Sequence, residues 1–338
     1  MGHLTAVITD FDYGDNDVER GILEPAGIEV IGLQAKSEDD LLTAARTCDA
    51  MMNQYARIGA RTIAAMTRCK VIARYGVGVD IVDVDAATAR GILVTNVRDY
   101  CTEEVADHAV ALWLALARKL MQFDRATHQG VWRWQSGAPI HRLRDQVMGI
   151  VSFGRIGRSI AQRAKSFGVK IIAYDPYQPA DVLAACGVRQ VSKEELVRDA
   201  DVIMMQVPMT DETRHFLSVK EFAAMRAGVI IVNTGRGPTI DNAALYDALR
   251  SGKVAGAGLD DPEEEPAKRS NWSPKSNPLF SLPNVIVTPH AAYYSEESIR
   301  LARETAAQEV RRVLSGEPPA NPVNRVRLAS GTMSMSQG

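Results

Sequence analysis

The chain has 338 residues, of which 46% are hydrophobic, and a chain of this length usually folds into two packed domains rather than one. Its 39 Lys and Arg nearly balance its 41 Asp and Glu, so no basic surface is expected for a nucleic acid or an anionic membrane. The four cysteines are dispersed without a metal-ligand or disulfide pattern, and no apolar run reaches the ~18 residues that span a bilayer, which favours a cytoplasmic protein that acts on small molecules.

The first part of the chain alternates short β-branched runs with segments whose apolar residues recur three and four positions apart, a pattern typical of parallel β-α units. The predicted strands are residues 6–9, 28–33, 50–53, 71–74 and 92–95. The fourth strand runs into RYGVGVD, where Gly76 and Gly78 allow backbone amides to form an anion-binding turn for a carboxylate. A plain turn between a strand and a helix is the alternative for this segment.

A long helix is predicted at residues 102–119, within CTEEVADHAVALWLALARKL. Thr102 is suited to cap its N-terminus, two glutamates follow in the first turn, and a basic pair stands at its end, so the charges follow the helix dipole. The helix is apolar on most faces, which predicts burial between domains or at a subunit interface.

The second set of predicted strands is residues 147–151, 169–174, 202–207, 229–233, 254–259 and 285–288. Six such strands suit a doubly wound nucleotide-binding sheet. A helix from residue 295 to about residue 314 follows the last strand and is placed to return the chain to the first domain. The small, polar residues 329–338 predict a disordered tail.

The first strand of this set leads into SFGRIG, which differs from the dinucleotide-binding fingerprint G-x-G-x-x-G only in Ser152. Gly154 stands where the backbone approaches a pyrophosphate, and Gly157 stands where the helix packs on the strand. Ser152 occupies the position of the tight turn, and it is small enough for that turn if its φ is negative. The next predicted strand ends before Asp175, 18 residues after Gly157. A carboxylate there would bind the ribose hydroxyls and repel a 2′-phosphate, which favours NAD over NADP. A tight turn in an α/β protein without this cofactor is the alternative.

Polar residues also follow three later strands of this set, at the edge of the sheet where ligands bind. Arg236 can hold a carboxylate or polarise a carbonyl, an acidic run begins at Asp260, and His290 can exchange a proton near neutral pH. We interpret the three together as a hydride-transfer site. Taken singly, the arginine could cap a loop, the acidic run could be a solvated turn, and the histidine could bond between domains. The other histidines, at positions 3, 108, 128, 141 and 215, lack such placement and are taken as structural or surface residues.

Together these segments resemble the D-isomer-specific 2-hydroxyacid dehydrogenase family over nearly the whole chain. The similar segments are RYGVGVDIVDVDAATARGI, TEEVADHAVALWLALAR, GIVSFGRIGRSIA, YDP, VNTGRGPTIDNAAL, GLDDPEEEP and VIVTPHAA. Within the family, NVRDYCTEEVADHA and FGVKIIAYDPY are most similar to the C-terminal-binding-protein-like bacterial members. The resemblance implies an α/β fold of two doubly wound parallel sheets, with a Rossmann NAD-binding domain at residues 101–293 inserted in a flavodoxin-like substrate domain at residues 1–100 and 294–330. It also implies a homodimer with the helix near residues 102–120 at its interface.

The resemblance implies a role for each matching position as well. Arg236 would orient the 2-keto acid, and His290 would be the acid/base. Glu265, the glutamate that precedes a proline five residues after Asp260, would pair with His290. The implied binding residues are Gly76, Val77 and Gly78 for the substrate carboxylate, Ser152, Gly154 and Gly157 in the cofactor turn, Arg155 and Ile156 at the pyrophosphate, Asp175 at the ribose, Pro208 and Thr213 at the adenosine, and Thr102, Thr234 and Asp260 at the nicotinamide.

Three features depart from the family pattern. Ser152 replaces a glycine, and Asp145 stands where the approach to the fingerprint strand usually has a glycine. Asp261 and Pro262 replace an apolar and an aromatic residue, and this change falls beside the expected acid/base pair.

The expected function is hydride transfer between NAD and C2 of a small D-2-hydroxy acid or its 2-keto acid, without a metal. Two alternatives stay open, which are a phosphoglycerate dehydrogenase and an NAD(H)-sensing, corepressor-like binding protein without turnover. The segment after the third strand, with Gln54, Tyr55 and Arg57, is expected to line the pocket for the substrate side chain, whose identity the sequence leaves open.

Overall fold

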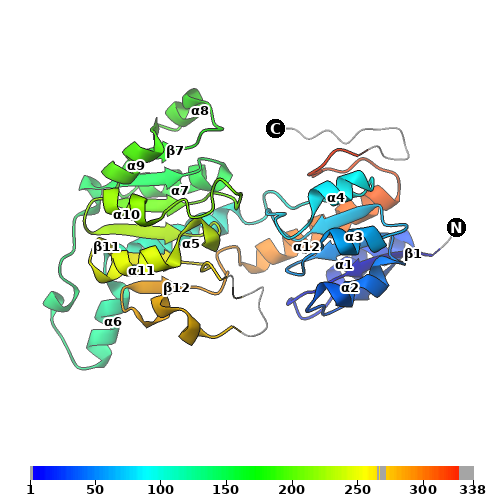
Figure 1. The fold of residues 1–338 in the computed structure, drawn as a ribbon, viewed down its shortest axis with the longest axis horizontal. Coiled ribbons are helices and arrows are strands. Elements are labelled where there is room, and N and C mark those ends of the chain that lie inside the picture. Colours follow the sequence, from blue (N-terminus) through cyan, green and yellow to red (C-terminus); the bar gives the residue numbers. More distant parts are fainter. Residues whose placement is uncertain (1–2, 265, 267–271, 327–338) are drawn as a thin grey trace. The chain divides into compact units, whose positions relative to one another are not determined.

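The computed structural model describes residues 3–264, 266 and 272–326, and its chain divides into two compact units (Figure 1). One unit consists of the residues up to Tyr100 and from Ser295 onward, and the other of Cys101–Tyr294. Each unit is built on one parallel sheet, which confirms the predicted α/β class. Glu265 and the predicted tail at 329–338 lie outside the described residues.

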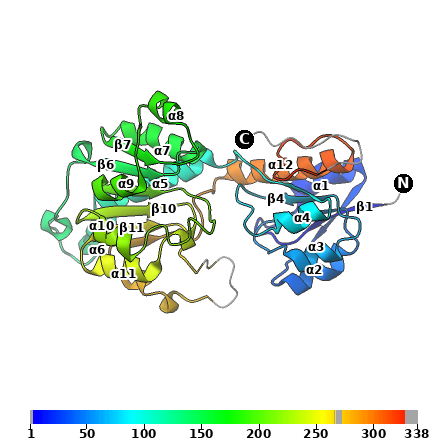
Figure 2. The ribbon, with the colours of Figure 1, turned by 45° about the horizontal axis from the view of Figure 1, so that its top comes forward.

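The first unit has a five-stranded sheet in the order β2-β1-β3-β4-β5, which is the flavodoxin-like order. Helices α1 and α12 cover one face of this sheet, and α2, α3 and α4 cover the other (Figure 2). Their apolar side chains form a core on each face. Strands covered on both faces are apolar throughout, which is why short apolar runs predicted them. The elements are β1 (Leu4–Ile8), α1 (Asp17–Leu23), β2 (Ile28–Gly32), α2 (Glu38–Ala45), β3 (Ala50–Asn53), α3 (Ala60–Ala65), β4 (Val71–Arg74), α4 (Val84–Ala89), β5 (Leu93–Thr95) and α12 (Glu296–Leu314).

The second unit has a seven-stranded sheet in the order β12-β11-β10-β9-β6-β7-β8, whose middle strands follow the Rossmann order. Helices α5 and α7 contribute to the core on one face, and α9, α10 and α11 contribute to the core on the other. The strands are β6 (Val147–Val151), β7 (Lys170–Tyr174), β8 (Arg189–Gln190), β9 (Val202–Met205), β10 (Val229–Asn233), β11 (Val254–Leu259) and β12 (Val285–Val287). The helices are α5 (Thr102–Ala117), α6 (Leu120–His128), α7 (Arg155–Lys165), α8 (Ala180–Ala185), α9 (Lys193–Asp199), α10 (Val219–Ala224) and α11 (Asn242–Arg250).

Two local features differ from the sequence prediction. The two-residue edge strand β8 was not predicted, because Arg189 and Gln190 form no apolar run. Thr102, predicted as the N-cap of the long helix, is instead its first helical residue, because the N-cap position with non-helical φ (−138°) falls on Cys101.

The turn after β6 carries the third difference. Ser152 has a φ of 75°, in the left-handed region that favours glycine, so the negative φ on which its tolerance was predicted is not present. Two hydrogen bonds hold this conformation: the Ser152 amide donates to the carbonyl of Tyr174 at 2.9 Å, and the next amide, of Phe153, donates to the Asp175 carboxylate at 2.7 Å. Serine therefore occupies the glycine position of the turn at a conformational cost.

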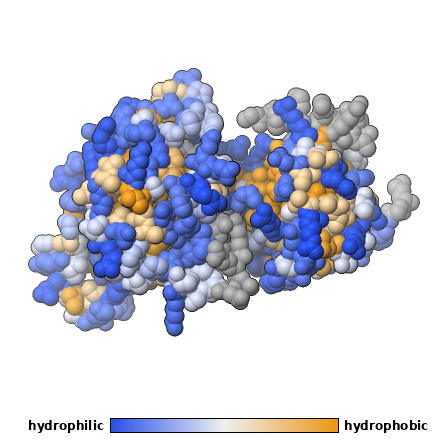
Figure 3. Space-filling view, viewed as in Figure 1, coloured by the Kyte–Doolittle hydropathy of each residue, from blue (hydrophilic) through white to orange (hydrophobic). Residues whose placement is uncertain are grey.

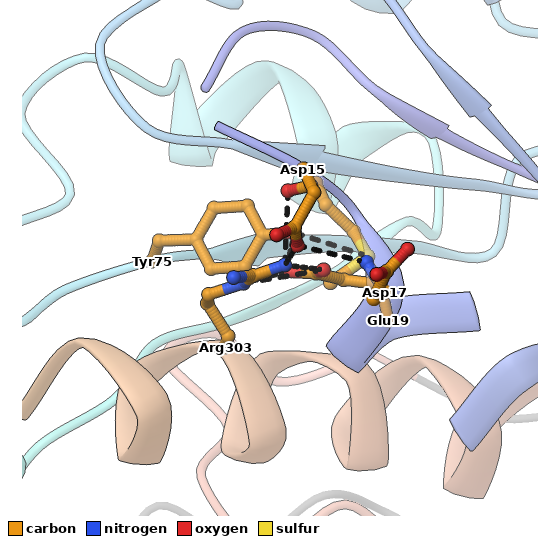
Figure 4. A network of polar contacts seen from close by, with 6 residues as sticks. Asp15, Asp17, Glu19, Tyr75 and Arg303 are labelled. Carbon is orange, nitrogen blue, oxygen red and sulfur yellow. Dashed lines mark hydrogen bonds and ion pairs between the residues drawn. The ribbon is translucent and has the colours of Figure 1, made fainter. Parts of the chain in front are cut away.

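A buried ionic network stabilises the first unit at the carboxyl end of β4 (Figure 4). Arg303 of α12 donates to both carboxylate oxygens of Glu19 in α1, at 2.8 to 3.3 Å, and to Asp15 at 2.9 Å. The hydroxyl of Tyr75 donates to Glu19 at 3.0 Å. Burial, and then the charge of Glu19, hold the pKa of Tyr75 well above its usual value. The network therefore fixes the residue that immediately precedes the glycine-rich turn at 76–78.

Ser152→Gly is expected to raise the free energy of unfolding of the second unit by about 1 kcal/mol, since a left-handed conformation costs an L-residue ~1–2 kcal/mol. Ser166→Gly is the control, because Ser166 is the C-cap of α7 at a φ of −62°, where glycine relieves no strain and is not expected to raise stability. Urea unfolding of the three proteins measures both effects. A Ser152→Gly protein no more stable than the wild type would contradict the assignment of strain.

Arg303→Leu is expected to destabilise the first unit by about 3–5 kcal/mol, because it leaves the buried Glu19 carboxylate without its cation. Arg300→Leu on the same helix is the matched control, since its pair with Glu304 is exposed to water and is expected to contribute little to stability. The midpoints of thermal or urea unfolding compare the two variants. Equal losses would show that the buried network is not specifically required.

Candidate cofactor and catalytic site

The carboxyl ends of six neighbouring strands of the second unit lie at one edge of its sheet. Their last residues pair in register from strand to strand, so the turns that follow them emerge side by side. Ligands of doubly wound sheets bind at this edge, and the strand order reverses direction here between β6 and β9. The paired terminal residues are, in sheet order, Val287, Leu259, Asn233, Met205, Val151 and Tyr174.

The glycine turn leads from β6 directly into α7. Gly154 is the N-cap of α7, and a Cβ built on it would meet no other atom within 4 Å, so the space beside this backbone is open. A Cβ on Gly157 would lie 2.4 Å from the carbonyl oxygen of Ser152, so only glycine allows the helix to pack this closely. The backbone amides in the first turn of α7, at Arg155 and Ile156, lack intrahelical acceptors, which is the arrangement that binds phosphate.

Asp175 follows β7 and is buried beneath the glycine turn. Its Oδ2 accepts the amide of Phe153 at 2.7 Å, and its Oδ1 accepts the amide of Tyr177 at 2.9 Å. A carboxylate offers about four acceptor positions, so two backbone bonds leave capacity for ribose hydroxyls. The predicted ribose residue therefore also orders the cofactor turn.

The loop after β10 is shaped by the side chain of Asn233. Its amide nitrogen donates to the carbonyl of Arg236 at 3.0 Å, and its oxygen accepts the amide of Gly235 at 3.0 Å. The predicted nicotinamide contact Thr234 accepts a hydrogen bond from Gln206 at 2.8 Å. These bonds place the half-buried Arg236 at the start of the short 3-10 helix Gly237–Thr239.

Asp260 joins the ends of β11 and β12. Its carboxylate accepts the hydroxyl of Thr288 at 2.5 Å and the amides of Ala291 and Ala292 at 2.9 Å each. Its carbonyl oxygen accepts the amide of His290 at 2.7 Å. Asp260, predicted as a nicotinamide contact at the start of the acidic run, thus holds the backbone on both sides of the predicted acid/base.

His108 of α5 reaches the same place, although it was predicted to be a structural or surface residue. Its Nε2 lies 2.9 Å from the Thr288 hydroxyl and 3.7 Å from Asp260. The helix can come this close because Gly258 of β11 has no side chain. A Cβ built on Gly258 would lie only 3.0 Å from Leu112 of α5. The small residues of VAGAGL were the available signal that a helix packs directly over this strand.

His290 has a φ of 54°, a conformation that non-glycine residues adopt mainly where the surroundings force it. Its ring is half-buried, and its Nδ1 lies 3.4 Å from Oδ2 of Asp261. Of the neighbouring glutamates, Glu263 contacts His215 at 2.5 Å and accepts the amide of Asn242 at 3.1 Å. Glu264 accepts bonds from the side chains of Asn242, Trp272 and Asn277. The predicted partner Glu265 lies outside the described residues.

The remaining predicted cofactor residues, Pro208 and Thr213, belong to the turn after β9. The hydroxyl of Thr213 donates to the carbonyl of Pro208 at 2.7 Å and accepts the amide of Thr210 at 2.8 Å. The two residues thus shape one loop at the same edge of the sheet.

In the first unit, the predicted carboxylate-binding turn follows β4. Gly76 has a φ of 150°, and a Cβ on it would lie 2.7 Å from the guanidinium of Arg74, so the turn requires glycine. The side chain of Asn96 donates to the carbonyl of Val77 at 2.7 Å, and the amide of Val97 donates to the carbonyl of Gly76 at 3.1 Å. These two hydrogen bonds fix the carbonyl groups of Gly76 and Val77.

The loop after β3 is ordered by two acidic residues. Buried Asp10 accepts the amides of Gln54 and Tyr55, and the Gln54 side chain is bonded in both directions to Asp12, at 2.6 and 3.0 Å. Gln54, predicted to line a pocket, is buried and positions the loop, whereas Arg57 is exposed.

Within the described ranges, no three or more His, Cys, Asp or Glu side chains gather as a metal site would need. In the same part of the chain, none of the helices combines the length and apolar character needed to cross a bilayer.

The chain is similar to known proteins over most of its length. Residues 110–292 match the family described as D-isomer specific 2-hydroxyacid dehydrogenase, NAD binding domain. A D-3-phosphoglycerate dehydrogenase of Methanocaldococcus jannaschii is 39% identical over 90% of this chain, which spans 56% of that protein's length. A glyoxylate reductase of Korarchaeum cryptofilum is 37% identical over 86% of each chain. The crystal structure of D-lactate dehydrogenase from Aquifex aeolicus, complexed with NAD and lactic acid, superimposes with a TM-score of 0.84 at 26% identity, covering 98% of this chain and 100% of that one.

Proposed function

Because this chain belongs to the D-isomer-specific 2-hydroxyacid dehydrogenase family, we propose that it interconverts a small D-2-hydroxy acid and its 2-keto acid, with NAD as its cofactor. The observation that carries the proposal is the register of β10, β11 and β12, which brings the turns of Arg236, Asp260 and His290 to one edge of the sheet. The glycine turn and Asp175 lie at the same edge. An NAD(P) cofactor fits the open space at Gly154 and the close packing at Gly157.

In the proposed reaction, a bound nicotinamide supplies or accepts the hydride. Arg236 orients the 2-keto acid through its planar guanidinium and stabilises negative charge on the reacting oxygen. His290 donates a proton to that oxygen during reduction and takes it back during oxidation, and Glu265 pairs with His290. In the first unit, the backbone at Gly76, Val77 and Gly78 binds the substrate carboxylate.

The proposed preference for NAD over NADP rests on Asp175. Its buried carboxylate follows β7, and the next residues are Pro176, Tyr177 and Gln178, so the turn brings no cation to a 2′-phosphate. Thr102, Thr234 and Asp260 are the proposed nicotinamide contacts, and Pro208 and Thr213 the proposed adenosine contacts. The cofactor is therefore selected mainly by charge at the ribose.

Glyoxylate reduction and phosphoglycerate oxidation are both candidate activities, since relatives of each name are 37% and 39% identical to this chain. Membership of the C-terminal-binding-protein-like subgroup stays a prediction, and so does a cofactor-sensing role without turnover. A cytoplasmic location is proposed from the buried free thiols of Cys48, Cys69 and Cys101, which suit a reducing compartment.

A homodimer is proposed from the surface around α6. Four large apolar side chains are exposed within a short stretch of chain there, whereas single exposed apolar side chains are normal on a protein surface. They are Leu120 (53% exposed), Met121 (47%), Trp132 (87%) and Trp134 (73%). In Figure 3 this part of the second unit shows a small hydrophobic spot within a mostly hydrophilic surface, and burial against a second copy would remove the four side chains from water.

The activity is tested with purified protein, NADH and a panel of glyoxylate, hydroxypyruvate, pyruvate and phosphohydroxypyruvate. His290→Gln is expected to lower turnover on the best substrate by about 10²–10⁴-fold, because it removes the proton donor, and to leave NADH affinity within about twofold. His3→Gln, at an exposed position of the first unit, is the control and should keep full activity. If the protein binds NADH but does not oxidise it with any acid of the panel, the enzyme proposal is wrong and the cofactor-sensing alternative takes its place.

Asp175→Ala is expected to reduce the ratio of NADH to NADPH affinity by about tenfold or more, since it removes a charge that repels the 2′-phosphate. Both affinities can fall, because Asp175 also holds the amide of Phe153, so the ratio is the informative quantity. Asp181→Ala, at an exposed position of α8, is the control. Dissociation constants from fluorescence titration decide the matter, and an unchanged ratio would show that Asp175 does not select the cofactor.

Replacing Trp132 and Trp134 together by Ser is expected to shift the protein from dimer to monomer in sedimentation velocity, because the change removes the two most exposed rings of the proposed interface. Val219→Ser, at a 70% exposed position of α10, is the control. A wild-type protein that sediments as a monomer would overturn the proposal.

A further inference from the structure

Two of the four cysteines lie opposite each other in the first unit. Cys48 stands two residues before β3, and Cys69 stands two residues before β4. The two strands are neighbours in which Ala50 pairs with Val71, so the same register places Cys48 opposite Cys69. Both side chains are buried in the core formed with α2, α3 and α4, with 0% of Cys48 and 8% of Cys69 exposed. Cysteines that are 21 positions apart in the sequence are thus neighbours in the fold.

The segments that carry the two thiols are joined to each other by their flanking residues. The amide of Lys70 donates to the carbonyl of Asp49 at 2.8 Å, which continues the pairing of β3 and β4 toward the cysteines. The guanidinium of Arg68 donates to both oxygens of the Asp49 carboxylate, with Nε 2.9 Å from Oδ1. The hydroxyl of Thr67 donates to the carbonyl of Arg46 at 2.8 Å. These bonds hold the two segments side by side at the position of the cysteines.

The spacing of the pair suits a disulfide. Positions that face each other on adjacent strands lie about 4.8 Å apart. The Cα atoms of a disulfide are usually about 4.4–6.8 Å apart. Both thiols are free in this structure, so the fold holds a reduced pair at a distance that a covalent bond can span.

The two thiols also interact with each other. A hydrogen bond with the Cys69 thiol lowers the pKa of Cys48, against the opposite effect of burial. The same hydrogen bond, and then burial, raise the pKa of Cys69 well above its usual value. Cys48 is therefore the thiol that ionises first, and the thiolate is the form that reacts with oxidants.

We propose that Cys48 and Cys69 are a redox-active pair, whose thiols close to a disulfide between the segments before β3 and β4 when a peroxide oxidises them. Hydrogen peroxide suits this nearly enclosed site because it is little larger than a water molecule. The pair lies in the first unit, and its oxidation does not depend on the proposed dehydrogenase activity.

The proposed oxidation has two steps. The Cys48 thiolate attacks one oxygen of the peroxide, so that an S–O bond forms, the O–O bond breaks, and the departing hydroxide takes up the proton that Cys48 had lost. The sulfur of Cys69 then gives up its proton and attacks the sulfur of Cys48, so that the S–S bond forms and the S–O bond breaks with release of a second water. The two sulfurs lose two electrons together, and the peroxide is reduced to two molecules of water.

The disulfide has two physical consequences. It closes a loop that contains β3, α3 and the segment 54–57, which was predicted to line the substrate pocket, and such a loop restricts the unfolded chain. Rapid closure also prevents irreversible oxidation, because the sulfenic acid of Cys48 is consumed by Cys69 before it can proceed to the sulfinic acid. Oxidation of this pair is therefore reversible by a thiol reductant.

Peptide mapping tests the pair directly. The purified full chain is treated with hydrogen peroxide, its remaining thiols are blocked with N-ethylmaleimide in denaturant, and the protein is digested with trypsin. Cleavage at the basic residues around the two cysteines gives the peptides 47–57 and 69–70. The expected product is these two peptides joined, with the sum of their masses less two hydrogens, and dithiothreitol should separate them again.

Two variants serve as comparisons. Cys186→Ser is the matched control, because it removes a half-buried thiol of the second unit and should leave the joined product unchanged. Cys69→Ser is expected to abolish the joined product, with sulfinic acid at Cys48 in its place. In the wild type, two unreacted thiols, two separate sulfinic acids, or a bond from either cysteine to Cys101 or Cys186 would overturn the proposal. The wild-type map decides the matter even if Cys69→Ser does not fold.

Thermal unfolding tests whether the native spacing suits the bond. The oxidised wild type is measured before and after dithiothreitol, which reduces the disulfide and leaves any methionine sulfoxide in place. The oxidised form is expected to unfold about 5 °C or more above the reduced form, because the closed loop restricts the unfolded chain. Peroxide-treated Cys69→Ser should show no such difference. A disulfide form that unfolds no higher than the reduced form would contradict the inference that the fold holds the thiols at disulfide spacing.

Discussion

The site depends on one buried carboxylate, that of Asp260, more than on any other interaction in the second unit. It accepts three hydrogen bonds from the segment that follows β12, and its own carbonyl holds the amide of His290. A non-glycine residue at a φ of 54° costs on the order of 1–3 kcal/mol, so such a conformation persists only where its surroundings determine it. The hydrogen bonds to Asp260 hold the backbone of His290 in this conformation. The backbone conformation of His290, the proposed acid/base, is therefore determined by a residue at the end of the neighbouring strand.

The cofactor turn uses the same device. Ser152 is also in the left-handed region, and the amide after it donates to the carboxylate of Asp175 at the end of the adjacent strand β7. In both places an aspartate one strand away holds a turn that would otherwise relax. The parallel register makes this possible, because the ends of neighbouring strands lie level and a short side chain spans the gap. The two residues with strained backbones, Ser152 and His290, and the aspartates that hold them therefore lie at the same edge of the sheet, where the ligands are proposed to bind.

The fold was largely predictable because its strands are buried on both faces and appear in the sequence as continuous apolar runs. Residues 50–53, 71–74, 147–151, 229–233 and 254–259 form strands with the predicted limits. Edge strand β8 has no such run, and the φ of Ser152 depends on bonds from another strand, so neither could be derived from local pattern. His108 lies about 180 positions from Thr288 in the sequence, and only the packing of α5 on a glycine-rich strand brings them to 2.9 Å. The polar residues after strand ends were predictable, whereas their hydrogen-bond partners were not.

The departures from the family pattern are physically coupled to this architecture. An apolar residue at position 261 would be neutral toward the ring of His290, but an aspartate adds a buried charge whose desolvation costs several kcal/mol unless a donor meets it. Within the described residues its Oδ2 has no hydrogen-bond partner, and its backbone cannot retreat, because Gly237 packs directly on it. A charge at position 261 therefore makes the packing of this loop more demanding than an apolar residue would.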